Sequence, residues 1–373
     1  MRRMLIIWVI LLAAVSCRER YDPPLISSKN SFLVVEANLN PQGLTSILVT
    51  KTVPLGSGSA SNISPVLNAQ ITVEGRDNSV RQLSSIGNGR YNNSNLGLTI
   101  GSEYRLHIKT NDGKEYLSDY VNARKTPVID SIVYELEAAG LRIQAHAHDV
   151  TKQTRYYRWD FDETWESRSY FPSTVIYDPN IRNIRDRIFP DEDVAVCWKY
   201  ETSAGIVLAN SARLSDDIIY KAPVQLIPNG NEKLAVRYSI LLRQYALDKE
   251  AYNFYELMKK NTEDLGNLFS PQPSEVRGNI RSIKDDKEFV LGYLTVSTVE
   301  EQRKFIQVPW NFSLNCNPFS VSEFLIDSIR KYFASGENIP YEHNKPDHLY
   351  RGAEAQCVDC TKRGGSTKKP SYW

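Results

Sequence analysis

The stretch GSEYRLHIKTNDGKEYLSDYV, residues 101–121, decides the fold class of this chain. Strand-forming residues recur with partial two-residue alternation on both sides of a turn sequence, Asn111-Asp112-Gly113. Asp-Gly tolerates the positive φ angle that a tight hairpin turn requires. The stretch therefore predicts two antiparallel strands joined by a short turn.

Strand-like runs of the same kind precede this hairpin. Turn sequences such as Asn40-Pro41-Gln42-Gly43 and Gly87-Asn88-Gly89 separate them. Six short strands at this spacing are typical of a sandwich, so we predict a small immunoglobulin-like β-sandwich over residues 31–125. Its first four strands are SFLVVEANL (31–39), TSILVTKTV (45–53), AQITVEGRD (69–77) and SVRQLSSI (79–86).

A second, larger β-rich domain is predicted over residues 126–373, because strand-like runs resume after Thr126-Pro127. The run TRYYRWDFDETW, residues 154–165, should form a strand whose side chains alternate between two faces. One face would carry Tyr157, Trp159 and Phe161, and the other Tyr156, Arg158 and Asp160.

Two helices are predicted within this second domain. Asp248 is a suitable N-cap for a helix through KEAYNFYELMKKNTEDL that stops at Gly266. Ser320-Val321-Ser322-Glu323 has the spacing of a capping box for a second helix, which stops at Gly336. Both helices have an apolar face and should pack on a sheet. The chain is therefore predicted to be mainly β, with two β-sandwich-like domains and helical insertions in the second.

The N-terminal sequence MRRMLIIWVILLAAVSC predicts export. A basic start precedes an apolar run too short to span a ~30 Å hydrocarbon core, so residues 1–16 fit a secretory signal peptide. Ala14-Val15-Ser16-Cys17 resembles a bacterial lipobox, which implies that Cys17 is acylated and becomes the first mature residue. Residues 17–30 are polar and proline-bearing, as in a tether to a lipid anchor. Ordinary secretion without acylation is the alternative.

The other four cysteines predict disulfide bonds, because an even count in an oxidising compartment favours pairing over free thiols. Three connectivities are open. A bond from the Cys357/Cys360 pair back to Cys197 or Cys316 would restrict the unfolded chain more than a local bond would. A zinc site and a redox pair are weaker alternatives. We therefore expect a disulfide-bonded C-terminal tail, with Gly364-Gly365 in a tight turn and Tyr372 and Trp373 docked as an apolar plug.

Composition and motifs narrow the function classes. The formal charge is +1, and removal of Arg2 and Arg3 with the signal peptide makes it −1, which argues against a nucleic-acid partner. The chain lacks G-x-S-x-G, H-E-x-x-H, a P-loop and a dinucleotide-binding glycine fingerprint. We therefore predict a protein that is not an enzyme and that needs no cofactor.

Two clusters of polar residues contain side chains that can bind metal ions. His146 and His148 would share one strand face, but a third ligand is not apparent in the sequence. Asp191-Glu192-Asp193 lacks the alternating spacing of a calcium loop. The favoured interpretation is an exposed strand end for the histidines and a solvated loop for the acidic residues, so no metal site is predicted.

An aromatic band offers the best ligand-binding candidates. Trp and Tyr supply a large contact area at low entropic cost and can stack on sugar rings or receive a peptide. Strand alternation implies that at least half of the band is core. The residues predicted to bind a small-molecule, peptide or glycan ligand are Tyr156, Arg158, Trp165 and Tyr170.

Several stretches together resemble one known family. They are LVVEANL, GRYNNSNLGLTIGSEYRLHIKTNDGKEYLS, the long run from RYSILLRQYALDKEAYNF to SEVRGNI, and the ending CVDCTKRGGSTKKPSYW. They resemble the domain-of-unknown-function 4249 lipoproteins of Bacteroidota. The resemblance implies an outer-membrane lipoprotein, often encoded near TonB-dependent receptors, and supplies no catalytic residues. Lipoproteins of such species often carry acidic residues soon after the acylated cysteine as a surface-export signal, and Arg18-Glu19-Arg20 is a mixed version of it. The resemblance therefore implies the cell surface, with the periplasmic face as the alternative.

The leading hypothesis is a non-enzymatic outer-membrane lipoprotein that assists a TonB-dependent transporter or captures its ligand at the cell surface. One alternative is an extracytoplasmic hydrolase acting on glycans or peptides, which would need a deep cleft with acid and base residues. The other alternative is a structural envelope protein.

Overall fold

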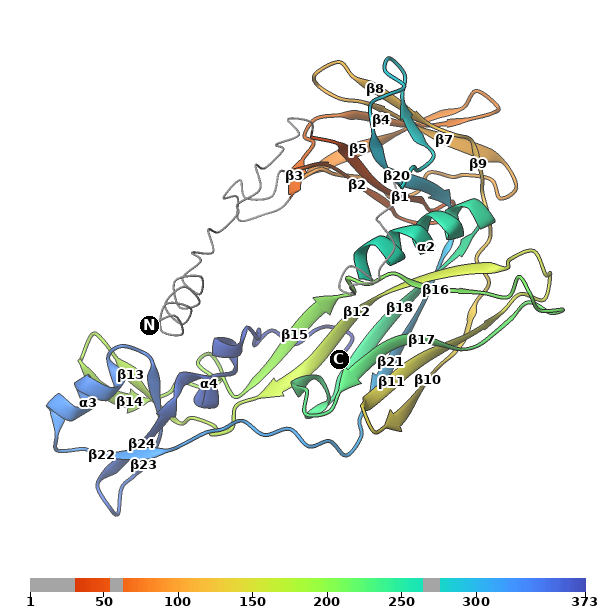
Figure 1. Ribbon diagram of the computed structural model, residues 1–373. Helices are drawn as coiled ribbons and strands as arrows, with labels where there is room; N and C mark the ends of the chain where they lie inside the picture. The colour runs from red at the N-terminus through yellow and green to blue at the C-terminus, as the bar shows by residue number, and fades with distance from the viewer. Residues whose placement is uncertain (1–30, 54–62, 264–275) are drawn as a thin grey trace, which may run out of the picture.

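The structure is a computed structural model that describes residues 31–53, 63–263 and 276–373. The chain forms three β-rich bodies arranged in a row (Figure 1). The predicted mainly β class is confirmed, and two of the bodies are built from packed β-sheet layers. The third body is small, and its residues lie within the predicted second domain, residues 126–373.

The N-terminal body is an eleven-stranded sheet that folds over on itself at β5, which pairs with β4 on one side and β6 on the other. The predicted hairpin is confirmed: β7 and β8 are antiparallel, and Gly113 has φ +77° in the turn. The strands are β1 (Leu33–Leu39), β2 (Thr45–Thr52), β3 (Ile63–Pro65), β4 (Gln70–Gly75), β5 (Val80–Gly87), β6 (Arg90–Asn93), β7 (Glu103–Lys109), β8 (Glu115–Ser118), β9 (Val121–Asn122), β19 (Ile280–Ser282) and β20 (Val290–Val296).

The last two of these strands correct the predicted domain division at residue 126. β20 pairs in parallel with β1, from Leu33 opposite Val290 to Leu39 opposite Val296. Its buried residues, including Leu294, belong to the core of the N-terminal body. Local sequence carries no information about which strand β20 pairs with, because every strand edge offers the same backbone groups.

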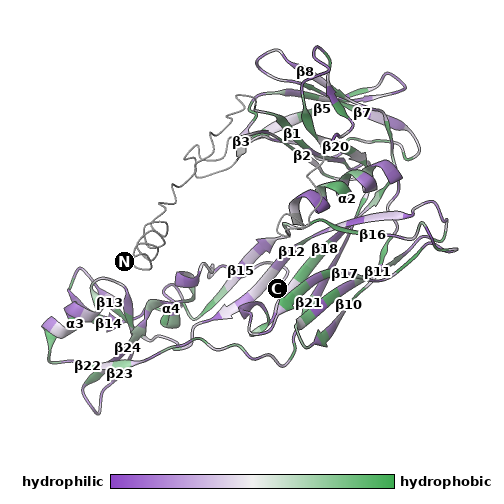
Figure 2. Ribbon diagram, viewed as in Figure 1, coloured by the Kyte–Doolittle hydropathy of each residue, from purple (hydrophilic) through white to green (hydrophobic). Residues whose placement is uncertain are grey.

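The central body packs a three-stranded sheet, β10-β11-β17, against a five-stranded sheet built around β12 and β18. On β12, Tyr157, Trp159 and Phe161 are buried, as the alternation predicted. Figure 2 shows the apolar colouring concentrated on these packed strands. The strands are β10 (Ile129–Glu137), β11 (Gly140–His148), β12 (Tyr156–Arg168), β15 (Val196–Thr202), β16 (Val207–Asn210), β17 (Ile218–Pro228), β18 (Tyr238–Leu247) and β21 (Val299–Ile306), with the short helix η1 (Glu232–Leu234).

The third body is built from two chain segments, one at residues 175–186 and one that begins at residue 319, which lie about 140 positions apart in the sequence. It combines one hairpin with a three-stranded sheet, β22-β24-β23, around small cores that include Ile184, Phe333 and Tyr341. Its elements are β13 (Val175–Asp178), β14 (Asn183–Asp186), β22 (Phe319–Ser322), α3 (Ile326–Phe333), β23 (Asn338–Asn344), β24 (Leu349–Glu354), α4 (Ala355–Val358) and η2 (Cys360–Arg363).

One helix prediction is confirmed and one is wrong in its start. α2 (Lys249–Glu263) begins after Asp248, whose Oδ1 accepts a hydrogen bond of 2.7 Å from the Ala251 N–H. Its predicted stop at Gly266 lies outside the described residues. The proposed capping box at residues 320–323 instead includes the end of strand β22, because these residues pair with β24. Among the described residues, no helix has the length and apolar character needed to cross a membrane.

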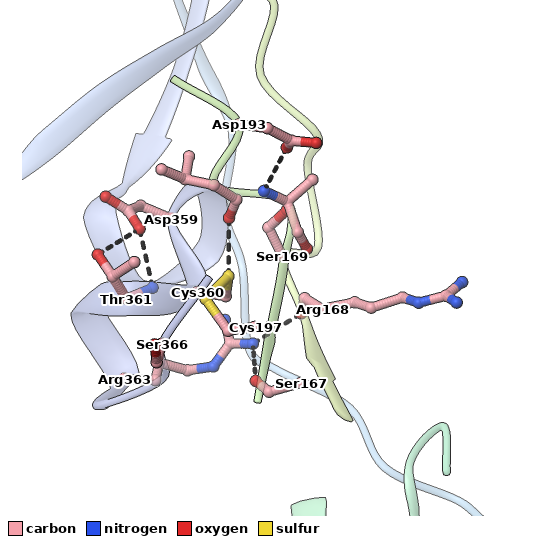
Figure 3. Close-up of a disulfide and its surroundings, with 12 residues drawn as sticks. Ser167, Arg168, Ser169, Asp193, Cys197, Asp359, Cys360, Thr361, Arg363 and Ser366 are labelled. Carbon is pink, nitrogen blue, oxygen red and sulfur yellow. Dashed lines mark hydrogen bonds between the residues drawn. A yellow bond between two sulfur atoms is a disulfide. The ribbon is translucent and has the colours of Figure 1, made fainter. Parts of the chain in front are cut away.

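Two disulfide bonds fasten the C-terminal segment to the rest of the chain. Cys197 on β15 bonds Cys360, closing a separation of 163 residues (Figure 3). Cys316 bonds Cys357 across 41 residues. This is one of the two long-range connectivities that the sequence left open. Each bond restricts the unfolded chain. From loop-closure entropy, each bond taken singly raises the free energy of unfolding by about 4 to 5 kcal/mol.

The tail beyond the disulfides lies on the central sheet, but not as a buried plug. Gly364 has φ +82° in the expected turn. The Tyr372 hydroxyl is 2.8 Å from Thr164 Oγ1, and the Arg303 guanidinium stacks 3.6 Å from the Tyr372 ring centre. Because 39% of Tyr372 remains exposed, stacking and hydrogen bonding hold it rather than enclosure.

Two adjacent crossovers join the N-terminal and central bodies. The first crossover passes through Thr126 and the second through Thr298, and both residues are buried. Thr298 Oγ1 accepts the Thr126 N–H at 2.8 Å, and the Thr126 hydroxyl donates to the Thr298 carbonyl. Thr126 Oγ1 also accepts the Ala246 N–H of β18 at 3.1 Å. One threonine thus ties both crossovers to the central sheet.

We therefore predict that Thr126→Val lowers the free energy of unfolding by about 2 kcal/mol, since a buried carbonyl and a buried N–H lose their partner. Urea unfolding monitored by tryptophan fluorescence measures the effect. Thr126→Ser is the matched control and should stay close to the wild type, because it keeps the hydroxyl. Equal unfolding midpoints for the two variants would contradict the assigned role.

Candidate functional site

A cleft of about 720 Å³ lies between the N-terminal and central bodies. One wall comes from β1, β2 and β20, the opposite wall from β12 and β18, and α2 covers one side (Figure 1). We call it the inter-body cleft and define it by Glu36, Arg158, Tyr245, Tyr255 and Tyr293, which represent these walls. Its volume lies within the ~300–1,000 Å³ usual for ligand pockets.

The α2 side of the cleft is aromatic and rigidly placed. Phe254 is buried, with its ring centre 5.2 Å from that of Tyr293 on β20 and 5.4 Å from that of Tyr255. Residues 254, 255 and 258 share one helical face, so the same turn of α2 presents Phe254, Tyr255 and Met258 to the cleft. The helix thus supplies a largely apolar wall with two rings fixed by mutual packing.

Arg158 is the most unusual group in the cleft. Its guanidinium carbon lies 4.3 Å from the Tyr245 ring centre and 5.0 Å from that of Tyr255, so two rings hold it. Its Nε is buried and has no hydrogen-bond partner among the described residues. The Asp160 carboxylate is 3.6 Å from Nη2, which is beyond hydrogen-bonding distance. Burial opposes the charge, but nearby Tyr255 and Asp160 outweigh burial and raise the Arg158 pKa, so this cation is permanent.

Arg243, in contrast, is fully engaged beside it. Its guanidinium pairs with Asp160 at 3.2 Å, with Glu301 at 3.0 Å and with Asp162. Burial would lower its pKa, yet the bond to Asp162 raises the pKa well above the usual range. Asp160 is therefore shared by the two arginines, with the closer contact to Arg243 and a longer ion pair of 3.6 Å to Arg158.

The four predicted ligand-binding residues do not form one site. Only Arg158 lines the inter-body cleft. Tyr156 packs on Tyr252 of α2, with ring centres 5.1 Å apart. Trp165 is buried in the central core, and Tyr170 is exposed on the connection into the third body. Strand alternation placed Arg158 on the correct face, but the sequence could not show which distant tyrosines would meet it.

The residues that sequence reasoning missed are Tyr245, Tyr255 and Tyr293. Tyr255 was assigned to the apolar face of the predicted helix, which is the face that lines the cleft. Tyr245 on β18 and Tyr293 on β20 have no local sequence feature that distinguishes them from core residues. Their common role depends on the approach of β18, β20 and α2, which are separated in the sequence.

Neither polar cluster resembles a metal centre. His148 Nδ1 is 2.7 Å from Asp130 Oδ1, while the His146 ring packs edge-on against Tyr220. Glu192 binds Arg185 at 2.7 Å and accepts the Ile188 N–H, which lowers its pKa to about 2. No cluster of three or more His, Cys, Asp or Glu residues in the described ranges is arranged to hold a metal ion.

Buried charges elsewhere in the central body are paired and structural. Glu163 is 2% exposed, accepts the Tyr238 hydroxyl at 2.7 Å and binds Lys233 at 2.5 Å. A neighbouring network connects the C-terminal segment to β12, because Arg363 donates to Ser167 Oγ at 2.8 Å (Figure 3). The same arginine binds Glu232 at 3.1 Å. These contacts hold the tail in place, and none of them lies at the inter-body cleft.

Comparison with known families gives a match to residues 18–303 with the family described as Domain of unknown function (DUF4249). The chain belongs to this family. A comparison of this DUF4249 protein with curated proteins finds no match.

Two solved structures illustrate its similarity to other chains. The chicken CNTN1 FN1-FN3 domains share 12% identity at a TM-score of 0.21, over 58% of this chain and 62% of that chain. A DUF3823 family protein from Parabacteroides merdae shares 10% identity at a TM-score of 0.12, over 58% of this chain and 90% of that one. Similarities this low carry no argument about function.

We predict that Asp130→Asn lowers the pKa of His148 toward its ordinary value, because the hydrogen bond that the His148 imidazole donates to the Asp130 carboxylate raises that pKa. A raised pKa in the folded state stabilises the protein below the ordinary histidine pKa, and this contribution disappears as the pH rises through the raised value. NMR titration of the imidazole resonances checks the shift. Asp216→Asn, which removes a partner of Lys152 instead, should leave the His148 titration unchanged.

Proposed function

We propose that this DUF4249 protein is a non-enzymatic outer-membrane lipoprotein, anchored through Cys17, that captures a ligand at the cell surface beside a TonB-dependent transporter. The observation that carries the proposal is the inter-body cleft, which unites an aromatic wall with a half-buried arginine whose Nε has no hydrogen-bond partner among the described residues. Convergence of a few polar groups in a mainly apolar hollow is the usual character of a binding site.

The charges of the cleft suit binding better than acid–base chemistry. A general acid or base needs a titratable group whose pKa lies near the working pH. Asp160 is paired with Arg243, and Arg158 and Arg243 keep their protons at any physiological pH. These charged groups therefore suit the binding of a charged ligand better than a reaction that needs a proton donor and a proton acceptor.

The anchoring part of the proposal is supported by the N-terminal sequence. The apolar run before Cys17 resembles that of an exported lipoprotein precursor, and two acyl chains anchor stably where one is marginal. The tether of residues 17–30 spans at most ~50 Å when extended. That reach places the folded bodies close to the bilayer in which a transporter lies.

The third body offers a surface for such a partner. Three consecutive apolar residues are exposed where β22 leads into α3: Phe324 by 70%, Leu325 by 56% and Ile326 by 44%. The preceding Glu323 accepts hydrogen bonds of 2.5 Å from both His343 and His348, which fixes the base of this turn. Exposed apolar runs of this kind are typical of interaction sites.

We predict that Cys17→Ala moves the mature protein from the detergent phase to the aqueous phase in Triton X-114 partitioning, because the acyl chains are then absent. The same experiment on Ser28→Ala, in the same tether, should leave partitioning unchanged. Intact-mass spectrometry of the wild type should show the added acyl mass. A wild-type product with an unmodified Cys17 would contradict the anchoring.

We predict that the tagged protein, purified in mild detergent from its own host, brings a TonB-dependent barrel with it. Phe324→Asp should reduce recovery of the barrel, because a charge on the exposed run opposes burial against a partner. Ile86→Asp is the matched control, since Ile86 is 59% exposed on the N-terminal body. Recovery of the wild type as a lone monomer would overturn the accessory role.

A further inference from the structure

We infer that the inter-body cleft takes a ligand with one carboxylate and an apolar body, and that Arg158 binds the carboxylate. This inference rests on the proposed capture function and names the class of ligand. It follows from three observations: the presentation of Arg158, the charge balance of the cleft and the chemistry of its walls.

The first observation is that Arg158 is preorganised for an oxyanion. Tyr245 and Tyr255 flank the guanidinium, which restricts its rotation without using any of its N–H donors. Nε is covered by protein atoms and has no hydrogen-bond partner among the described residues, while 21% of the side chain remains exposed to the cleft. The planar guanidinium matches a carboxylate in a bidentate manner, and prior immobilisation reduces the entropy lost on binding.

The second observation is the charge count. The cleft is lined by Arg90, Arg158 and Arg243 and by two carboxylates, Glu36 and Asp160. Arg243 is already bound to Asp160, Asp162 and Glu301, so the lining cations that a ligand can engage are Arg90 and Arg158. A singly charged carboxylate needs one such cation, whereas a doubly charged phosphate would be repelled more strongly by Glu36 and Asp160. These charges therefore favour a monoanionic carboxylate.

The third observation is the apolar surface next to Arg158. Phe254, Met258, Leu291 and Tyr293 line the cleft from α2 and β20. Burial of an apolar ligand group there contributes roughly 25 cal/mol per Å² removed from water. The cleft thus combines one site for a charge with a larger region for an aliphatic or aromatic group.

The cleft walls are held in position before any ligand arrives. The crossovers at Thr126 and Thr298 connect the two bodies through buried hydrogen bonds, and β20 connects the second crossover to β1. No large rearrangement is needed to bring Arg158 and the β20 wall together. A purely structural role for Arg158, joining α2 to β18 by stacking, is the competing explanation, and it predicts a change in stability without any effect on ligand choice.

The experiment measures ligand preference on the full mature protein in detergent. The probes are phenylalkanoic acids and N-acyl amino acids, each tested beside its own primary amide by thermal shift and then by calorimetry. For the wild type we expect each bound acid to bind about 10- to 100-fold more tightly than its amide, as for a charge-assisted hydrogen bond.

Three variants assign the preference to Arg158. Arg158→Met keeps a long side chain between the rings and should abolish the difference between acid and amide. Arg158→Lys keeps the cation but loses the planar fork, and should retain only part of the difference. Arg303→Met is the matched control, because Arg303 also stacks on a tyrosine but lies outside the cleft, and it should keep the full preference.

Each of the other outcomes contradicts a specific part of the inference. Equal binding of acids and amides to the wild type would overturn the carboxylate inference and leave capture in the cleft intact. Failure of every probe, acid and amide alike, would overturn the inference and count against capture as well. An unchanged preference in either folded Arg158 variant would show that Arg158 has only the structural role.

Discussion

The structure depends on the paired crossovers between its first two bodies. Thr126 and Thr298 exchange hydrogen bonds, and Thr126 also binds β18, in a place where water cannot substitute. Each buried backbone group there needs a protein partner, so the two crossovers and the central sheet constrain one another. Without these hydrogen bonds, the two crossovers that connect the N-terminal body to the central body could move independently of each other. With them, the two walls of the inter-body cleft keep one geometry.

That geometry explains how an incompletely paired cation persists inside the protein. A buried Nε–H without a hydrogen bond is unfavourable, and the two tyrosine rings around the half-buried Arg158 offset only part of this. Packing from three elements holds it there nevertheless. The Nε of Arg124 is likewise buried without a partner among the described residues, so the stacking of two rings on Arg158, rather than its Nε alone, distinguishes the cleft arginine.

Much of the fold followed from local pattern. Asn111-Asp112-Gly113 predicted its hairpin, the alternation along β12 predicted which side chains are buried, and Asp248 predicted the start of α2. The capping-box prediction at Ser320 failed because the same residue pairs with Arg351 of β24, and sheet pairing outweighed the local helix signal. Of the predicted ligand-binding residues, only Arg158 reached the cleft, since Trp165 faces the core and Tyr170 is exposed near the third body.

The sequence by itself therefore determined the β-rich class, the faces of individual strands and the presence of paired cysteines, because these depend on residue type and spacing over a few positions. Only the tertiary structure decided that β20 returns to β1, that Cys197 bonds Cys360, and that tyrosines from β18 and α2 enclose Arg158. The physical reason is that strand edges and thiols are chemically alike along the chain. Which of them meet is set by the packing free energy of the whole molecule.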